Sequence, residues 1–132
     1  MNPRPIMVGM SLCDHVIVEE RTKKVSLIGA FTGLGVAEFP AHVPPFSVFA
    51  VLTDGVGTAT MELLVTHMDT NEEVYSHHAT LTFPDKVADV LYHLRLRRFV
   101  FPASGTYQFT LLLDGDWMAQ RRLRVYQREI EA

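Results

Sequence analysis

The chain has 132 residues, of which 48% are hydrophobic and 20% are charged, and its formal net charge is -3. This length fits one domain, and the composition is that of a globular chain with a core rather than of a disordered chain. The weak negative charge excludes a general attraction to nucleic acid or to anionic membranes, so we expect neither as a partner.

The chain carries no recognisable targeting signal. Cys13 is the only cysteine, which excludes an internal disulfide and fits a reducing compartment. Residues 1–12 lack the apolar run of a signal peptide, and no segment approaches the roughly 20 apolar residues that span a bilayer. We therefore expect a cytoplasmic protein.

Short runs of alternating apolar and polar residues, separated by turn residues, fill the chain, and this pattern is typical of an all-β sandwich or barrel. A Pro-containing crossover at 40–45 predicts a change of sheet, as in a Greek key. We expect one antiparallel two-sheet sandwich over residues 1–132, immunoglobulin-like or Greek-key, with an ordered core at about 8–126 and a short C-terminal tail at 127–132. An open barrel is the alternative. The eight predicted strands lie at 8–19, 24–32, 45–53, 58–68, 73–83, 90–101, 106–114 and 117–126.

The hairpin between the fourth and fifth predicted strands can be aligned from its polarity, because a slip of one residue moves every side chain to the other face. A three-residue loop at 69–71 pairs Met68 with Glu72. Further along, it pairs Val65 with Tyr75, and this register collects the apolar residues on one face.

The strands that follow are aligned in the same way. A four-residue loop before the seventh predicted strand pairs Leu96 with Leu111, and a three-residue loop after it pairs Leu113 with Trp117. Trp117 is accordingly predicted to anchor the core. The predicted core residues of these strands are Leu94, Leu96, Val100, Tyr107, Phe109, Leu111, Leu113, Trp117, Ala119, Leu123 and Val125.

Catalytic and metal-binding signatures are absent from the sequence, which has no phosphate-binding loop, no Gly-x-Ser-x-Gly and no His-Glu-x-x-His. Adjacent strand residues face opposite sides, so His77 and His78 cannot enter one metal site. His78 is instead predicted to face Glu62, and His93 to face Asp114, as cross-strand polar pairs. We therefore predict no enzyme, no cofactor and no metal site.

Asp14 has the apolar neighbours Leu12 and Val16 on its side of the strand, so it is predicted to point inward. Burying a carboxylate without a partner costs several kcal/mol of folding free energy. A cation or backbone N–H donors must therefore stabilise a buried Asp14. We expect an internal ion pair with Arg121 or, as the second choice, Arg98. A ligand site at Asp14 is the alternative.

Three short motifs suggest a family. They are Cys-Asp at 13–14, Phe-Pro at 39–40, and Gly-x-Tyr-x-Phe at 105–109 followed by Leu-Asp-Gly at 113–115. With these the chain resembles a group of small uncharacterised bacterial β-sandwich proteins over roughly residues 12–126. The resemblance implies the fold and implies no activity.

The outer face of the last three predicted strands mixes arginines with apolar and aromatic side chains, which are residue types enriched in protein interfaces. This face consists of Arg95, Arg97, Phe99, Leu112, Met118, Arg122, Arg124 and Tyr126. We predict that it binds a protein partner or a second copy of the chain. A plain solvated face, or a site for an anion or single-stranded nucleic acid, is the alternative.

The sequence therefore favours a non-catalytic interaction or structural domain. A small-ligand or carbohydrate-binding sandwich is the alternative function, and it would use His42, Trp117 and Asp114 provided that Trp117 is exposed beside a concavity. A metal-dependent enzyme is the third hypothesis.

Overall fold

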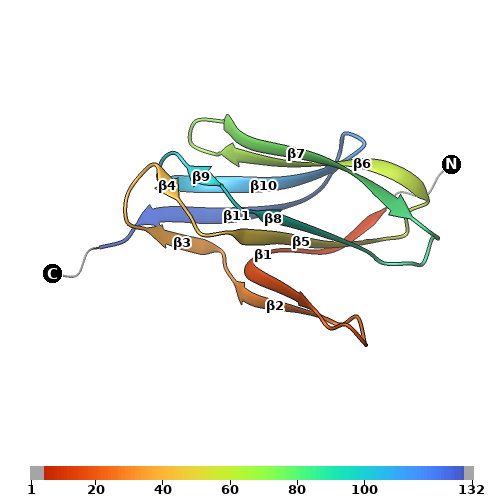
Figure 1. Cartoon of the computed structure of the whole chain (residues 1–132). Helices are drawn as coiled ribbons and strands as arrows, with labels where there is room; N and C mark the ends of the chain where they lie inside the picture. The colour runs from red at the N-terminus through yellow and green to blue at the C-terminus, as the bar shows by residue number, and fades with distance from the viewer. Residues whose placement is uncertain (1–4, 130–132) are drawn as a thin grey trace.

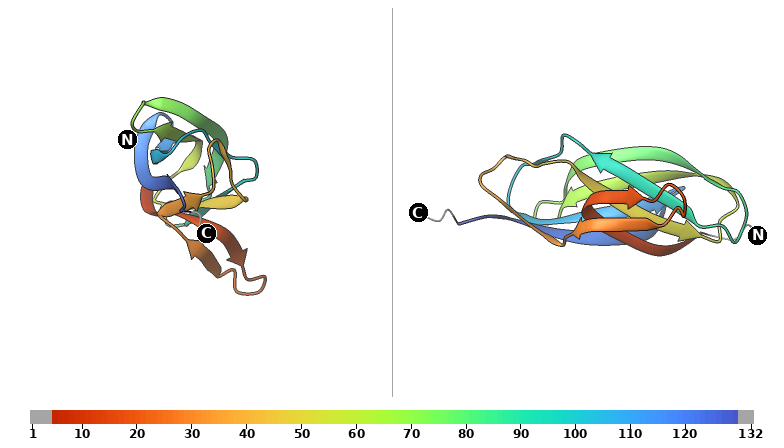
Figure 2. Two further views of the ribbon diagram at one scale, coloured as in Figure 1. Left: turned by 90° about the vertical axis from the view of Figure 1, so that its left-hand side faces the viewer. Right: turned by 60° about the horizontal axis from the view of Figure 1, so that its bottom comes forward.

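The computed structural model describes residues 5–129 and consists of two large β-sheets packed face to face, with a third sheet of two short strands (Figures 1 and 2). Its strands are β1 (Ile6–Val18), β2 (Val25–Ala30), β3 (Gly33–Val36), β4 (Ala41–His42), β5 (Phe46–Thr53), β6 (Gly57–His67), β7 (Glu72–Phe83), β8 (Val90–Leu96), β9 (Val100–Phe101), β10 (Gly105–Leu113) and β11 (Asp116–Gln127). One sheet has the order β2-β1-β5-β8, the other has the order β3-β11-β10-β6-β7, and β4 pairs with β9.

The predicted all-β sandwich is confirmed, and across residues 5–129 the two main sheets stay separate rather than closing into a barrel. All strand pairs are antiparallel except β3 with β11. The burial follows the alternation in the sequence, since every second residue of β6 from Met61 to His67 is buried. The part of the chain that the structure describes contains no helix suited to crossing a membrane. Residues 130–132 of the predicted C-terminal tail lie outside the described residues.

The predicted strand list differs from the structure in two places: β3 was not predicted, and the strand predicted at 90–101 is divided. The segment predicted as a strand at 24–32 forms β2, after which the chain crosses to the other sheet and β3 pairs in parallel with β11. The strand predicted at 90–101 ends at Leu96 and resumes as β9. The break at 97–99 leads the chain out of the four-stranded sheet.

The β6–β7 hairpin has the predicted register over most of its length, and Val65 faces Tyr75. The predicted pair next to the turn, Met68 with Glu72, is wrong, because His67 faces Glu72 instead. The turn is one residue longer than expected. A register shift just beyond Val65 compensates for it and restores the apolar face.

The predicted pairing of the strand at 90–101 with the strand at 106–114 is wrong. β8 lies beside β5, where Leu96 faces Phe46, whereas β10 lies between β6 and β11, where Leu111 faces Leu63. The break after β8 is the reason, because the chain changes sheets there and the segment before β10 is a crossover rather than a hairpin loop.

Aromatic rings from both sheets form the centre of the core. The ring centroid of Phe46 lies 5.7 Å from that of Phe99, 6.3 Å from that of Phe101 and 6.2 Å from that of Phe109, which are normal separations for interacting rings. Of the predicted core residues, Leu94, Val100 and Ala119 are partly buried, Trp117 is exposed, and the other seven are buried: Leu96, Tyr107, Phe109, Leu111, Leu113, Leu123 and Val125.

Tyr107 fastens the crossover loop that precedes β10. Its buried hydroxyl donates to the carbonyl of Ala103 at 2.6 Å and accepts from the Ala103 amide at 3.3 Å. Gly105 has a φ of 139°, and a Cβ there would lie 2.7 Å from His67 Nε2, so only glycine fits. The same Nε2 lies 3.0 Å from the carbonyl of Ser104. These contacts bind the loop to β6.

Candidate functional site

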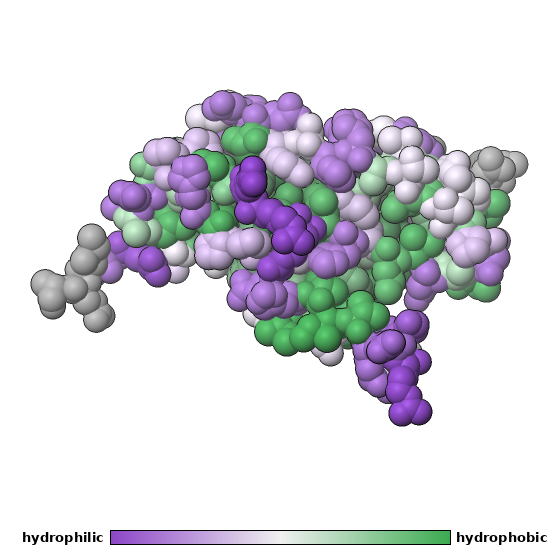
Figure 3. Space-filling model, viewed as in Figure 1, coloured by the Kyte–Doolittle hydropathy of each residue, from purple (hydrophilic) through white to green (hydrophobic). Residues whose placement is uncertain are grey.

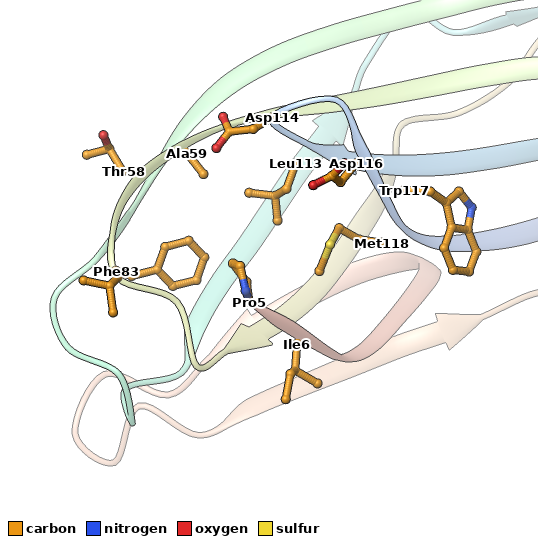
Figure 4. A pocket seen from close by; sticks show the side chains of 11 residues that line it. Pro5, Ile6, Thr58, Ala59, Phe83, Leu113, Asp114, Asp116, Trp117 and Met118 are labelled. Atoms are coloured by element: carbon orange, nitrogen blue, oxygen red, sulfur yellow. The ribbon is translucent and has the colours of Figure 1, made fainter. Parts of the chain in front are cut away.

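A pocket of about 500 Å³ opens at one end of the sandwich, where the β10–β11 turn meets the β5–β6 loop and the start of β1 (Figure 4). Small-molecule sites usually have volumes of roughly 300–1,000 Å³. We call this space the end pocket. It is lined by Pro5, Ile6, Val56, Thr58, Ala59, Phe83, Leu113, Asp114, Asp116, Trp117 and Met118.

Trp117 stands at the margin of the end pocket and is 60% exposed. Asp114 and Gly115 have φ values of 48° and 84° and form a two-residue turn, the type I′ geometry that Asp-Gly favours. This turn is one residue shorter than predicted, so Trp117 faces Leu112 on the outer side of the sheet. A bulge at Met118 then restores the register. The prediction that Trp117 anchors the core is therefore wrong.

The floor of the end pocket is apolar. Phe83 and Leu113 are buried and Met118 is partly buried, and Figure 4 shows their side chains reaching toward the middle of the space from three strands. Gly55 allows the β5–β6 loop to lie directly on the ring of Phe83, because a Cβ at this position would be 2.5 Å from the ring carbon Cδ1.

Two carboxylates, Asp114 and Asp116, stand among the lining residues. The Oδ1 atom of Asp114 accepts a hydrogen bond from the Thr60 amide at 2.8 Å, and the Asp114 amide donates to the Thr60 carbonyl at 2.8 Å. Both bonds tie the β10–β11 turn to β6. Since an ionised carboxylate only accepts hydrogen bonds, this pocket suits a ligand that brings donors.

Exposed apolar side chains gather at the same place. Ile6, Val56 and Trp117 are 54%, 55% and 60% exposed, and all three line the end pocket. Clustered apolar exposure marks binding surfaces more often than single exposed residues do. The pocket can therefore hold a ligand that has one apolar face and several hydrogen-bond donors.

Residues 9–126 match the model of DUF6941, a family of unknown function. The chain belongs to this family. The DUF6941 chain is also similar to the solved sensor domain of the anti-sigma factor RsgI4 of Pseudobacteroides cellulosolvens, with 10% sequence identity over 98% of this chain and 95% of that chain and a TM-score of 0.44. No curated protein matches the chain. Membership in an uncharacterised family agrees with the resemblance found in the sequence.

The eight residues predicted as a partner-binding face of the DUF6941 chain do not share one surface. Arg95 lies on β8 in the four-stranded sheet, and Arg97 lies in the break that follows it. Phe99 is only 5% exposed and packs in the core. The single face is a wrong prediction because it rested on pairing β8 with β10.

The β10–β11 part of that face does form one surface. Arg122, Arg124 and Tyr126 are exposed, and the guanidinium carbon of Arg124 lies 5.7 Å from the centre of the Tyr126 ring, which is a cation–π distance. Leu112 is partly buried opposite Trp117. Met118, by contrast, packs against the core.

Asp14, Arg98 and Arg121 are all exposed. Within residues 5–129 neither arginine forms an ion pair with Asp14. The predicted internal ion pair is therefore wrong. β1 pairs with β5 only as far as Cys13, and Asp14 lies just beyond that point, where β1 pairs with β2 alone. Arg121 lies on a stretch of β11 that β3 does not flank, because that pairing begins at Arg124.

The histidines are dispersed. His78 Nε2 lies 3.3 Å from Glu62 Oε2, as predicted, on an exposed face. His93 does not face Asp114, since β8 lies in the other sheet. His42 is on β4, at the opposite end of the sandwich from the end pocket (Figure 1). Within residues 5–129 no three His, Cys, Asp or Glu side chains come together as a metal site.

A second polar cluster lies on the outer side of the four-stranded sheet. His93 Nε2 lies 2.8 Å from the hydroxyl of Ser47, and Arg95 Nη1 donates to the same hydroxyl at 3.1 Å. Burial and the charge of Arg95 lower the pKa of His93, so the neutral ring can accept a hydrogen bond from the Ser47 hydroxyl. Because Ser47 is fully buried, a substrate cannot reach it, and the cluster joins strands.

Proposed function

We propose that the DUF6941 chain is a non-catalytic binding domain that holds a sugar ring of a carbohydrate in the end pocket. The observation that carries this proposal is the indole of Trp117, which is 60% exposed at the margin of a pocket of about 500 Å³ that also contains two carboxylates.

A sugar ring matches this chemistry on both of its sides. One face of a pyranose presents C–H groups, which pack against an apolar aromatic surface such as the indole of Trp117. Its hydroxyl groups donate hydrogen bonds, and Asp114 and Asp116 supply acceptors. The buried floor formed by Phe83 and Leu113 takes no part in polar recognition, so the acceptors set the orientation of the ring.

Titration of the native chain followed by fluorescence tests the proposal directly, because Trp117 is the only tryptophan. The probes are soluble cello-, xylo-, malto- and chito-oligosaccharides. We expect at least one series to shift and quench the emission with saturation. Trp117→Ala, measured by calorimetry, abolishes this binding, and Asp116→Asn weakens it. Incubation with the bound sugar releases no new reducing ends.

A matched control is Leu91→Ala, which removes an exposed apolar side chain from β8, away from the pocket. It is expected to leave sugar binding unchanged. If no oligosaccharide alters the emission, or if Trp117→Ala binds sugar as well as the native chain does, the proposal is wrong. Release of reducing ends would instead replace the non-catalytic role with a hydrolytic one.

A protein partner on the β11 surface is the second candidate function. It is supported by the exposed Arg124–Tyr126 stack, because arginine and tyrosine are enriched at interface hot spots. The double variant Arg122→Glu with Arg124→Glu should lose proteins that co-purify with the native chain, while the control Arg21→Glu on the β1–β2 turn should retain them.

A further inference from the structure

The second half of β1 and all of β2 form a hairpin that extends beyond the sandwich. β1 pairs with β5 as far as Cys13, and from Cys13 to Val18 it pairs with β2. Figures 1 and 2 show the hairpin leaving the stacked sheets. Faces of this hairpin are therefore in contact with solvent, whereas the corresponding faces of strands within the sandwich are covered by the opposite sheet.

This hairpin carries exposed apolar side chains. Ile17, Val18 and Ile28 are 50%, 52% and 47% exposed. Figure 3 shows hydrophobic surface gathered over the hairpin, with a hydrophilic group of residues at its tip. A two-stranded hairpin is only marginally stable in water by itself, so this surface gains from being covered.

β2 is also the edge strand of its sheet. Natural edge strands are protected from pairing with other chains by charged residues, above all lysine, or by proline. From Val25 to Ala30, β2 has no charged residue and no proline, and its backbone is irregular only at Gly29, whose φ is 68°. It can therefore accept a further strand.

We propose that β2 pairs with β2 of a second copy of the same chain, antiparallel, around a two-fold axis near Leu27. A strand related to itself by such an axis runs antiparallel to its copy, so the contact is self-complementary and ends at two chains. The two four-stranded sheets become one continuous sheet, and the exposed residues of each hairpin lie beside those of the other. This proposal is independent of the end pocket.

The charges on the hairpin complement each other in this arrangement. The carboxylate of Asp14 lies over Gly29, since a Cβ at Gly29 would overlap with Asp14 Oδ2. The negative charge of Asp14 on β1 thus lies beside one end of β2, and Lys24 lies just before the other end. Antiparallel pairing near Leu27 brings Lys24 of each copy beside Ala30 of the other, next to that copy's Asp14. No like charges meet along the strands.

Sedimentation of the full chain over a range of concentrations tests the proposal. We expect a reversible dimer. We also expect the hydrogen exchange of the β2 amides to become slower as the fraction of chains in the dimer increases. Ile28→Lys places a charge on the edge and should give a monomer. The matched control is Val87→Lys, which makes the same change at a residue that is 82% exposed in the β7–β8 loop and should leave the dimer intact.

A charge exchange tests the register even if Ile28→Lys disturbs the hairpin. Asp14→Lys and Lys24→Glu should each weaken the dimer by about tenfold, because the axis makes each change act twice. The double variant should restore the native dissociation constant. A chain that stays monomeric at all concentrations overturns the proposal. A dimer that survives Ile28→Lys, or single variants without effect, overturns it as well.

Discussion

Tyr92 and Tyr107 are both buried, but their hydroxyl groups differ in hydrogen bonding. The hydroxyl of Tyr107 is bonded to the backbone of Ala103 through both its donor and its acceptor. The hydroxyl of Tyr92 is buried and has no hydrogen-bond partner among the described residues. The same substitution, tyrosine to phenylalanine, should therefore have opposite effects at the two positions.

The expected magnitudes follow from these surroundings. Tyr107→Phe removes two hydrogen bonds to an exposed loop residue that water can solvate, so the loss of unfolding free energy should be about 1 kcal/mol. Tyr92→Phe removes a desolvated hydroxyl that gains nothing in return, so stability should stay level or rise by up to about 1 kcal/mol. With an unfolding entropy of about 2.1 cal/mol/K per residue and 132 residues, about 1 kcal/mol corresponds to roughly 4 °C in Tm.

Scanning calorimetry and urea unfolding followed by circular dichroism measure both variants. Tyr126→Phe, on an exposed tyrosine, is the control and should remain within about 0.5 kcal/mol of the native chain. The reasoning is refuted if Tyr92→Phe lowers Tm as much as Tyr107→Phe does, because a hydroxyl without a partner cannot stabilise the fold in this way.

Three further outcomes are expected. The thiol of Cys13 is fully buried and burial raises its pKa, so a chromogenic disulfide reagent should modify it only as the chain unfolds; modification of the native chain within seconds would contradict this. The folded state lowers the pKa of His93 from 6.5, so unfolding free energy should fall as pH drops below about 6.5. His93→Gln should reduce the loss of unfolding free energy between neutral and acidic pH. An unchanged pH dependence would contradict the role given to His93. Gly105→Ala should cost more than about 1 kcal/mol, because its Cβ would press on His67, whereas Gly9→Ala meets nothing within 4 Å and should be neutral; equal losses would refute the comparison.

The alternation of apolar residues was sufficient to predict the fold class and the body of the β6–β7 hairpin. Val65 and Tyr75 face each other because a local hairpin has only a few possible registers, and only one of them collects the apolar residues on one side. The longer turn could not be predicted, because a register shift a few residues away cancels its effect on polarity.

The partner of β8 could not be predicted in this way. Arg98 lies between Leu96 and Val100, so the alternation continues through the break at 97–99 as if one strand ran on. Alternation shows which side of a strand is apolar, but it carries no information on which sheet the strand joins. The predicted partner face depended on that choice and failed with it.

The end pocket could be predicted from the sequence only in part. The sequence predicts Asp114 and Trp117 as part of a ligand site, but the three-residue loop that it predicts at Asp114 turns Trp117 inward, whereas the observed turn has two residues. The Asp-Gly dipeptide at 114–115 was the signal for the shorter turn. Asp14 shows a similar limit, because alternation did not indicate that β1 stops pairing with β5 after Cys13.

The order of strands in the five-stranded sheet has a consequence for biosynthesis. β10 and β11 lie between β3 and β6, yet they are the last two strands of the chain. As translation proceeds from the N-terminus, β3 and the β6–β7 hairpin emerge first, and nothing yet joins them. The edge of β6 that pairs with β10 stays without a partner strand until residues 105–127 leave the ribosome. Nascent chains that stop before Gly105 should therefore depend on chaperones or be degraded, even though about four fifths of the sequence has been made.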